Sequence, residues 1–445
     1  MRACVMGLVV FAILGNTVCG VLPTVGLTQK RFFSLANSKE LFEDFVSRFH
    51  RTYSGAQEYQ TRFQIFQETL RQINERNAQE KEAVHGVTRF ADRSLEEREK
   101  MQGTQVPPPF LSSRFTQNGA GGAYVRPPPA NCSKNWVAGH SGYYTIRNQA
   151  ACGNCWSYGV AETIRDNFIQ RYGKDPGRLS SQYLTDCAVP AWTCSNDSNV
   201  KNGCCGGDPF KAMNWIAEHG IATTDDYGGE KYDASLLANV SKSGLDPNKA
   251  FKCKASVPRM ITTTTVPQLI TGSGYFNLTD ERIDYLQRLR RENGTVAAMK
   301  YACLHFGFFC PINGTHQLRS PEPYMVNQIC NVGPIIIGVC GKSLFTYVSG
   351  VLTADSCCNV LSHSVEAVGF DREKQAYIVR NSWGGLGGEE SNFGVSPFSP
   401  YERYHQLPDG NWTQGGYFLL KYGENACQVA TAAMKTPELA YTEAK

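Results

Sequence analysis

Apolar residues recur with helical spacing in the first part of the chain. Residues 38–101 are rich in charge and free of cysteine, and they carry an apolar stripe at Phe63, Phe66, Leu70 and Ile73. Steps of three and four residues place such side chains on one face of an amphipathic helix. The segment is therefore predicted to form two packed helices.

A later region combines one helical pattern with several strand patterns. The stretch CWSYGVAETIRDNFIQRYG, from Cys155 to Gly173, has apolar residues at Val160, Ile164 and Phe168 and ends in a glycine, as helices often do. The runs GPIIIGV, SHSVEAVGF, QAYIVRNSW and GGYFLLKY are short and rich in β-branched or aromatic residues, which is typical of strands. We therefore predict an α+β fold, with the helix first and a mainly antiparallel sheet or barrel after it.

The two regions are separated by residues 106–130, VPPPFLSSRFTQNGAGGAYVRPPPA, which show little periodicity. Clusters of proline, glycine and serine are typical of exposed linkers, where proteases cut. The chain is thus divided at about residue 125, with a helical core at about 38–101, a linker at 102–125 and a large piece at 126–445.

The N-terminus has the pattern of a secretory signal. Met1 and Arg2 precede the apolar run VMGLVVFAILG, which is too short to span a bilayer and which nothing before it could cover as a buried helix. We therefore expect a signal peptide at residues 1–20, no membrane span, and a mature protein outside the cytosol. Secretory passage also fits the seven Asn-x-Ser/Thr sequons, at Asn131, Asn196, Asn239, Asn277, Asn293, Asn313 and Asn411.

Composition changes this picture little. The 445 residues are 42% apolar and 19% charged, which is ordinary for a globular protein. The net charge is only +4, and the lysines and arginines form no dense block. Nucleic acid is therefore not an expected partner.

The cysteine count is more informative, because it is odd. Removing Cys4 and Cys19 with the signal leaves 15 of the 17 cysteines. Disulfides in an oxidising compartment account for an even number of cysteines. The count therefore predicts one free thiol beside up to seven disulfides.

The pair Cys152-x-x-Cys155 has four interpretations. A zinc site needs a second Cys/His pair at ligand spacing, and the nearest candidate, GCCGGD, has adjacent cysteines in a glycine turn. A thioredoxin-type redox pair needs a short α/β domain, whereas this chain is large and rich in cysteine. A disulfide for both cysteines leaves the odd count unexplained. The fourth makes Cys155 a nucleophile, because the first turn of a helix favours a thiolate.

A nucleophilic thiol needs a histidine base, a group that orients the base, and donors for an oxyanion. Gln149 lies six residues before Cys155, His363 lies in NVLSHSVEAVGF, and Asn381 lies in YIVRNSWGG on the next predicted strand. Two adjacent strands would bring the imidazole and the amide side by side. Trp383 would then shield the pair from water.

These motifs resemble those of the papain-like cysteine proteases. NQAACGNCW is similar to the family's N-Q-G-x-C-G-S-C-W, LSHSVEAVGF to its x-x-H-A-V-x-x-V-G-Y, and VRNSWG to its K-N-S-W-G. The resemblance places Gln149, Cys155, His363 and Asn381 at the oxyanion-hole, nucleophile, base and orienting positions. It implies a papain-like two-lobed fold, with a helical lobe around a long central helix and an antiparallel β-barrel lobe. It also implies peptide hydrolysis that requires no metal or organic cofactor.

The resemblance further implies a set of substrate-binding residues. NGCCGGDPF is similar to the family's G-C-x-G-G turn beside the cleft, where glycines offer backbone to an extended peptide. In the pocket for the side chain two residues before the cut, the small Gly338 implies room for a bulky apolar group. The implied set is Gly206, Gly207, Asp208, Pro209, Gly338, Ser362, Ser364 and Trp383. The implied disulfides are Cys152–Cys204 and Cys187–Cys253.

The leading segment is similar to the propeptides of the cathepsin L-like branch. The pattern E-x3-R-x2-[VI]-F-x2-N-x3-I-x3-N matches, with Thr69 in place of its first Asn, and G-x-N-x-F-x-D matches with Thr88 in place of Asn. The matching residues are Glu58, Arg62, Ile65, Phe66, Ile73, Asn77, Gly86, Phe90 and Asp92. The resemblance implies an inactive zymogen, with an inhibitory propeptide at 21–125 and a peptidase domain at 126–445.

The resemblance has two interruptions, at about residues 255–330 and 385–415, which we expect to be insertions. It implies a monomer in the lysosome, an endolysosomal vacuole or the extracellular space. Expected partners are protein and peptide substrates, the propeptide itself, and cystatin-like inhibitors.

Three function classes are compatible with these motifs. An active endopeptidase is favoured, because all four catalytic positions carry competent residues. A non-catalytic family member that only binds peptides would not need them. An exopeptidase is the nearer alternative, since an insertion could block one end of the cleft.

Overall fold

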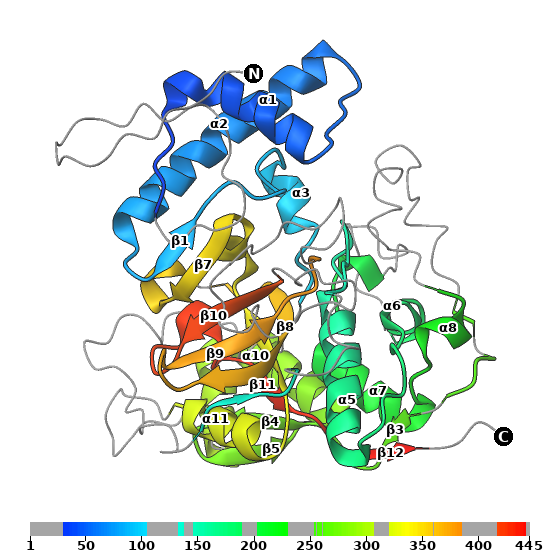
Figure 1. Ribbon diagram of the computed structural model, residues 1–445. Helices are drawn as coiled ribbons and strands as arrows, with labels where there is room; N and C mark the ends of the chain where they lie inside the picture. Colours follow the sequence, from blue (N-terminus) through cyan, green and yellow to red (C-terminus); the bar gives the residue numbers. More distant parts are fainter. Residues whose placement is uncertain are drawn as a thin grey trace.

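A helical N-terminal domain lies on a two-lobed body in the computed structural model of the chain (Figure 1). The expected signal peptide and the insertion expected at 385–415 lie outside the described residues. The structure describes residues 30–104, 132–137, 146–188, 203–229, 253–254, 256–259, 261–306, 320–358, 360–384 and 416–441.

The N-terminal domain contains the two predicted helices. Helix α1 spans Ser38–Arg48 and α2 spans Ala56–Gln79, after a short 3-10 turn at Leu35–Asn37. Their apolar faces pack on each other, so the predicted stripe is buried apart from the partly buried Phe63. The domain ends with strand β1, Ala83–His85, and the short helix α3, Leu95–Glu99.

Strand β1 attaches this domain to the body. It pairs antiparallel with β7, Tyr347–Leu352, with Ala83 opposite Gly350 and Val84 opposite Ser349. The N-terminal domain therefore adds an edge strand to the main sheet of the body.

The helical lobe is built around α5, Cys155–Tyr172. Nearly every residue of α5 is buried, and Gly173 closes the helix in a left-handed conformation (φ 64°), as the sequence predicted. Its apolar side chains form one core with the neighbouring helices of the lobe. Those helices are α6 (Ser181–Cys187), α7 (Pro209–His219) and α8 (Thr224–Tyr227), with a 3-10 turn at Gly203–Cys205.

The other lobe is a sheet in the order β1-β7-β10-β9-β8-β6-β11-β4-β5, with β2 added beside β8. The four predicted strands are β6, β8, β9 and β10, and their pairings are antiparallel except for the parallel pair β10–β7. The bounds are β2 Lys134–Asn135, β4 Gln268–Thr271, β5 Gly274–Asn277, β6 Ile335–Val339, β8 His363–Asp371, β9 Ala376–Arg380, β10 Tyr417–Lys421 and β11 Ala433–Lys435. Strands β3 (Ile261–Thr263) and β12 (Leu439–Tyr441) pair separately.

Short helices and disulfides close the sheet lobe. Helix α11 spans Glu322–Asn331, and 3-10 turns lie at Gly341–Thr346, Ala354–Ser356 and Ala426–Gln428. No pairing was predicted for the cysteines of this lobe. The structure joins them as Cys132–Cys330, Cys340–Cys358 and Cys357–Cys427.

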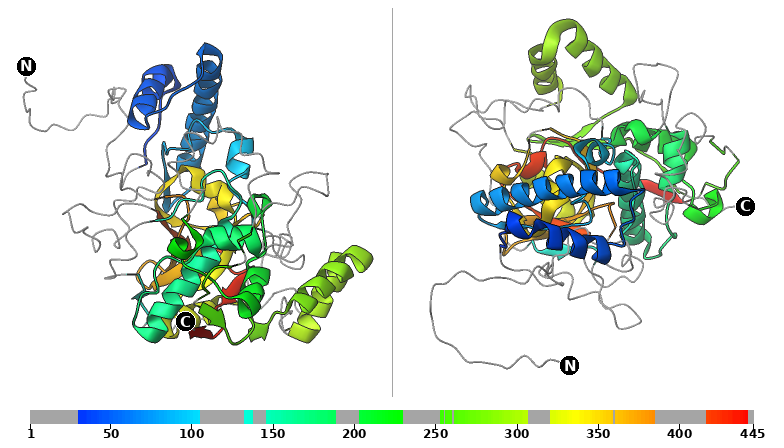
Figure 2. Two further views of the ribbon diagram at one scale, coloured as in Figure 1. Left: turned by 90° about the vertical axis from the view of Figure 1, so that its right-hand side faces the viewer. Right: turned by 90° about the horizontal axis from the view of Figure 1, so that it is seen from above.

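The stretch expected as an insertion at 255–330 extends the sheet and adds a helix. Strands β4 and β5 pair with each other, and β4 joins the sheet at β11. Helix α10, Asp280–Phe306, bends at Gly294, where φ is 83°. It projects at the end of the molecule away from the N-terminal domain (Figure 2). This part of the chain therefore lies away from the face that the N-terminal domain covers.

Candidate active site

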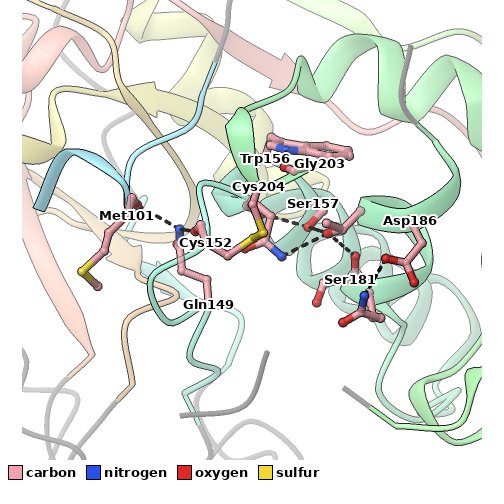
Figure 3. The surroundings of a disulfide bond; sticks show 12 residues. Met101, Gln149, Cys152, Trp156, Ser157, Ser181, Asp186, Gly203 and Cys204 are labelled. Atoms are coloured by element: carbon pink, nitrogen blue, oxygen red, sulfur yellow. Dashed lines mark hydrogen bonds between the residues drawn. A yellow bond between two sulfur atoms is a disulfide. The ribbon is translucent and has the colours of Figure 1, made fainter. Parts of the chain in front are cut away.

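The free thiol lies at the start of α5. Cys155 is the first residue of the helix, is fully buried, and is the free cysteine among the residues that the structure describes. Its neighbour Cys152 is bonded to Cys204, which ties the loop before the helix to the glycine-rich turn (Figure 3). The other implied disulfide, Cys187–Cys253, is present as well.

The imidazole and the amide come from two adjacent strands. His363 begins β8, Asn381 follows the last residue of β9, and the two strands pair antiparallel. The imidazole Nε2 and Asn381 Oδ1 are 2.8 Å apart. The indole of Trp383 covers this pair, with its ring centroid 4.5 Å from that of the imidazole. Both His363 and Trp383 are fully buried.

The surroundings of Cys155 favour its thiolate. Burial alone would raise the pKa of the thiol. The charge and hydrogen bond of His363, together with hydrogen bonds from Thr104 and the backbone of Ser364, lower that pKa to about 7. A cysteine with such a pKa is partly ionised at neutral pH and is therefore a competent nucleophile.

The side chain of Gln149 is fixed by hydrogen bonds at both ends. Its Oε1 accepts from Ser382 Oγ at 2.6 Å and from the indole N–H of Trp383 at 3.1 Å. Because the oxygen is held by two donors, the amide nitrogen must face the opposite side. That nitrogen donates to the carbonyls of Cys152, at 2.8 Å, and Met101, at 2.9 Å (Figure 3).

A segment of the N-terminal domain lies directly on the thiol. The N–H of Gly103 is 3.4 Å from Cys155 Sγ, and the hydroxyl of Thr104 is 3.2 Å from it. The segment is held by backbone hydrogen bonds, from Gly207 N to Gly103 O at 2.8 Å and from Thr104 N to Ser362 O at 3.0 Å. These bonds attach the segment to both lobes, with Cys155 between them.

The segment fits because two glycines allow close approach. A β-carbon on Gly103 would lie 1.7 Å from the carbonyl oxygen of Gly153. A β-carbon on Gly207 would lie 2.4 Å from the ring of Trp156. Any side chain at residue 103 would therefore push the segment away from the loop before α5, and any side chain at residue 207 would displace the Trp156 indole.

Comparison with known families agrees with this geometry. Residues 131–397 match the model of the papain family cysteine proteases, and residues 42–97 match the cathepsin propeptide inhibitor domain. The chain belongs to the papain family of cysteine proteases. It carries the family's propeptide inhibitor domain, and it is therefore a cysteine peptidase made as a proenzyme.

Similar proteins cover most of this papain-family chain. A cathepsin L-like proteinase of Phaedon cochleariae is 26% identical over 363 residues, which cover 80% of this chain and 87% of that protein. Pro-cathepsin H of Bos taurus is 23% identical over 427 residues, covering 95% and 94%. Digestive procathepsin L2 from the larval midgut of Tenebrio molitor has the same fold, with a TM-score of 0.53 at 19% identity, covering 90% of this chain and 99% of that one.

The propeptide docks on the enzyme through an aromatic cluster as well as through β1. The ring of Phe90 lies 5.3 Å from that of Phe345 and 5.6 Å from that of Trp383, measured between centroids. The hydroxyl of Thr88 donates to the Phe345 carbonyl, and Gly86 N donates to Thr346 O at 2.9 Å. The motif that departs from the family pattern at Thr88 thus supplies much of this contact.

The other departure, Thr69, also makes hydrogen bonds. Its hydroxyl donates to the carbonyl of Ala91 at 2.9 Å and accepts from Arg98 Nη2 at 2.8 Å. The hydroxyl therefore holds the end of the second motif and α3 against α2. Nearby, Arg62 forms an ion pair with Glu97, so the charged residues of this pattern have a structural use.

Two of the implied substrate-binding residues, Gly207 and Ser362, contact the propeptide through their backbones. Ser362 Oγ also donates to Gln102 Oε1 at 2.6 Å. Gly206 adopts a positive φ of 112°, which fits its place in the turn. Trp383 lies over the imidazole of His363, as described above.

Of the remaining implied residues, Asp208 and Pro209 lie at the start of α7 and Gly338 lies on β6. Asp208 caps α7 by accepting from Phe210 N at 2.8 Å, and burial raises its pKa to about 7. Pro209 is the first residue of that helix. A β-carbon on Gly338 would lie 3.3 Å from side-chain atoms of Ala432 and Leu361, so apolar groups occupy the space beside it.

Ser364 faces the helical lobe. A β-carbon on Gly159 of α5 would lie 3.1 Å from its hydroxyl. The side chain therefore packs between the lobes, while its backbone N–H is directed at Cys155.

Sequence reasoning missed the residues that occupy the cleft. The linker was expected to begin at residue 102, but Gln102, Gly103 and Thr104 are bound in the cleft, and Gly103 and Thr104 are buried. A segment of three residues is too short to show a periodic pattern. Its role depends on contacts with residues that are distant in sequence, so the sequence alone does not reveal it. The rest of the expected linker, 105–125, lies outside the described residues.

None of the helices in the described ranges has both the length and the apolar character that crossing a bilayer requires. The same residues contain no group of three or more His, Cys, Asp or Glu side chains that could hold a metal ion.

Proposed function

We propose that this papain-family proenzyme matures into an endopeptidase in which Cys155 is the nucleophile. His363 is the general base and acid, Asn381 orients the imidazole, and Gln149 donates to the oxyanion. The observation that carries the proposal is the environment of Cys155, a free thiol at a helix N-terminus whose pKa is lowered to about 7 beside His363.

Each step of the reaction uses an atom that is already in place. The Cys155 thiolate attacks the peptide carbonyl carbon, and the oxyanion receives hydrogen bonds from Gln149 Nε2 and the Cys155 backbone N–H. His363 then gives its proton to the leaving amine, and an acyl-enzyme forms. In deacylation His363 takes a proton from water, which attacks the thioester. Asn381 Oδ1 accepts from Nε2 throughout, which leaves Nδ1 for the sulfur and the substrate.

The bound propeptide segment is not aligned for attack. The carbonyl that accepts from Gln149 belongs to Met101, whereas the groups nearest the sulfur are the N–H of Gly103 and the hydroxyl of Thr104. Attack requires one carbonyl to meet the oxyanion donor and the sulfur at once. The segment therefore blocks the thiol without presenting it with a cleavable bond.

The path of this segment favours endopeptidase over exopeptidase activity. The segment occupies the cleft on both sides of Cys155. At one end the Met101 carbonyl accepts from Gln149, and at the other the Thr104 N–H donates to the Ser362 carbonyl. An exopeptidase needs one end of the cleft closed, and helix α10 of the insertion lies at the far end of the molecule (Figure 2). Within the described residues, α10 therefore closes neither end of the cleft, which supports a substrate that continues in both directions.

The remaining expectations complete the proposal. The signal peptide at 1–20 and the propeptide at 21–125 are removed, and the peptidase domain at 126–445 acts in a lysosome-like compartment or outside the cell. The sequons at Asn277 and Asn293 lie at exposed positions, which suits glycosylation on that route. The mature enzyme is a monomer, and cystatin-like inhibitors bind the cleft that the propeptide vacates.

Titration with an epoxide inhibitor of thiol proteases tests the nucleophile. The processed wild-type enzyme should bind one equivalent at Cys155 and lose activity, whereas Cys155→Ala should bind none. The absence of labelling in processed wild type would end the proposal.

A second experiment separates the two peptidase classes. Fluorogenic peptides with both termini blocked should be cleaved at rates similar to those with one free terminus. Refusal of the doubly blocked peptides would assign the enzyme to the exopeptidases.

A further inference from the structure

A buried ion cluster joins the two lobes behind the catalytic residues. Its centre is Arg380, the residue before Asn381, whose side chain is almost fully buried. The single atom Arg380 Nη2 lies 2.9 Å from Asp166 Oδ2 and 3.1 Å from Glu162 Oε2, and it also donates to Glu366 Oε2. Asp166 and Glu162 belong to α5, and Glu366 belongs to β8.

The cluster uses the same elements as the catalytic residues. Asp166 lies eleven residues after Cys155 on α5, close to a whole number of helical turns, and so on the same face. Glu366 lies three residues after His363 on β8 and opposite Arg380 on β9. The cluster thus fixes the thiol-bearing helix against the strands that carry the imidazole and the amide.

Charges in the cluster do not balance if every carboxyl is ionised. Arg147 bonds Glu162 at 2.8 Å, and Arg380 is left to face both Asp166 and Glu366. The remaining cation, Arg165, is engaged by two bonds to Asp175, which is 41% exposed. Among the residues that the structure describes, Tyr417, the neighbour of Arg380 on β10, is a further titratable group beside the cluster.

A buried carboxylate without a compensating cation raises the free energy of the folded protein. Binding a proton removes the charge and with it this penalty. Burial raises the pKa of Glu366 well above its usual range and that of Asp166 to about 6. Burial acts the same way on Glu162, but Arg380 and Arg147 lower its pKa to about 2. The excess proton therefore belongs to Asp166 and Glu366.

We propose that Asp166 and Glu366 share one proton and that this pair, clamped by Arg380, is a positioning device for the active site. Loss of the proton would leave two like charges around one guanidinium and push α5 away from β8. Hydration cannot relieve them, because the adjoining cavity, lined in part by Glu366, Arg380 and Asn381, has a volume of about 10 Å³, room for a single water at most. The proposal rests on the catalytic roles given above to Cys155, His363 and Asn381.

Three variants of the full chain, expressed as the proenzyme and then processed, test the proposal. Glu366→Gln keeps the shape of a protonated carboxyl and cannot ionise. Glu366→Ala removes the group. Asp284→Asn is the matched control, because it alters an exposed carboxyl that pairs with Lys211 on another helix and leaves the three buried carboxyls and their arginines in place.

The first readout is the pH profile of peptide hydrolysis. Glu366→Gln should keep kcat within about twofold of wild type in mildly acid solution and extend activity about one pH unit further into the alkaline range. Glu366→Ala should lower kcat about tenfold or more with little change in KM, and Asp284→Asn should match wild type. An unmoved alkaline limit in Glu366→Gln would overturn the proposal, even if Glu366→Ala fails to fold.

The second readout does not depend on catalysis. The infrared difference spectrum between wild type and Glu366→Gln should contain the carbonyl band of a buried protonated carboxyl, and so should the same difference in the Cys155→Ala background. The contribution of other buried carboxyls with a raised pKa, such as Asp208, cancels in each difference. A missing band would overturn the shared proton while leaving the proposed peptidase intact. If the proposed peptidase function were wrong instead, the epoxide would not label the processed protein, while the infrared band would still be present.

Discussion

The propeptide contacts the enzyme in two regions that differ in kind. In the first, which we call the dock, β1 pairs with β7 and Phe90 packs on Phe345 and Trp383. In the second, the cleft segment Gln102–Thr104, the contacts are made by backbone groups and small or polar side chains. Apolar burial contributes most to affinity, whereas the cleft segment alone blocks the sulfur. We infer that the dock holds the propeptide and the cleft segment inhibits.

The largest effect is expected from Phe90→Ala, which removes the aromatic core of the dock. Truncating a buried phenylalanine typically costs about 3–5 kcal/mol. The propeptide should therefore detach from the proenzyme at a lower temperature, measured by calorimetry of the Cys155→Ala proenzyme. Phe32→Ala is the control, because that ring is 58% exposed. Equal transition temperatures in the two variants would argue against the dock.

Gly103→Ala separates inhibition from affinity. Its β-carbon would collide with the Gly153 carbonyl, and overpacking of this kind costs about 1–3 kcal/mol. The cleft segment should lift from Cys155 while the dock holds, so the proenzyme should react faster with an epoxide inhibitor at an almost unchanged melting temperature. Gly55→Ala, at a position with no neighbour within 4 Å, should behave as wild type. Slow labelling of Gly103→Ala would show that the segment is not what blocks the thiol.

A smaller loss is expected from Thr88→Val, which removes the buried hydroxyl that donates to the Phe345 carbonyl and accepts from the Phe90 N–H, while keeping the shape of the side chain. The typical cost of such a bond is about 1 kcal/mol. The transition temperature should fall less than in Phe90→Ala, and the rate of epoxide labelling should change little. Thr61→Val, whose hydroxyl is exposed on α2, provides the comparison. A fall in transition temperature as large as that of Phe90→Ala would contradict the prediction that aromatic packing contributes more to the dock than this hydroxyl does.

Local patterns were sufficient to predict much of this fold. The helical stripe predicted α2, the glycine at residue 173 marked the end of α5, and the four β-branched runs became β6, β8, β9 and β10. The odd cysteine count predicted a single free thiol, and Cys155 is free in the structure. These features depend on residues close in sequence or on simple arithmetic.

Features that depend on distant contacts could not be predicted. The segment Gln102–Thr104 was assigned to the linker, because its role depends on Gly153 and Gly207, which are far along the chain. The ion cluster was missed for the same reason, since Arg380 and Glu366 look like ordinary polar positions of strands. The roles of Gln149, His363 and Asn381 were predicted from the requirements of a nucleophilic thiol together with motifs that resemble those of a known family.

The most direct test of the central claim is the rate at which Cys155 of the processed enzyme is alkylated by iodoacetamide as a function of pH. The account predicts a midpoint well below the usual thiol pKa of 9.0, because His363 lowers the pKa of this thiol. It also predicts that His363→Ala moves the midpoint upward, because the imidazole stabilises the thiolate. A midpoint near 9.0 in the wild-type enzyme, unmoved by His363→Ala, would contradict it.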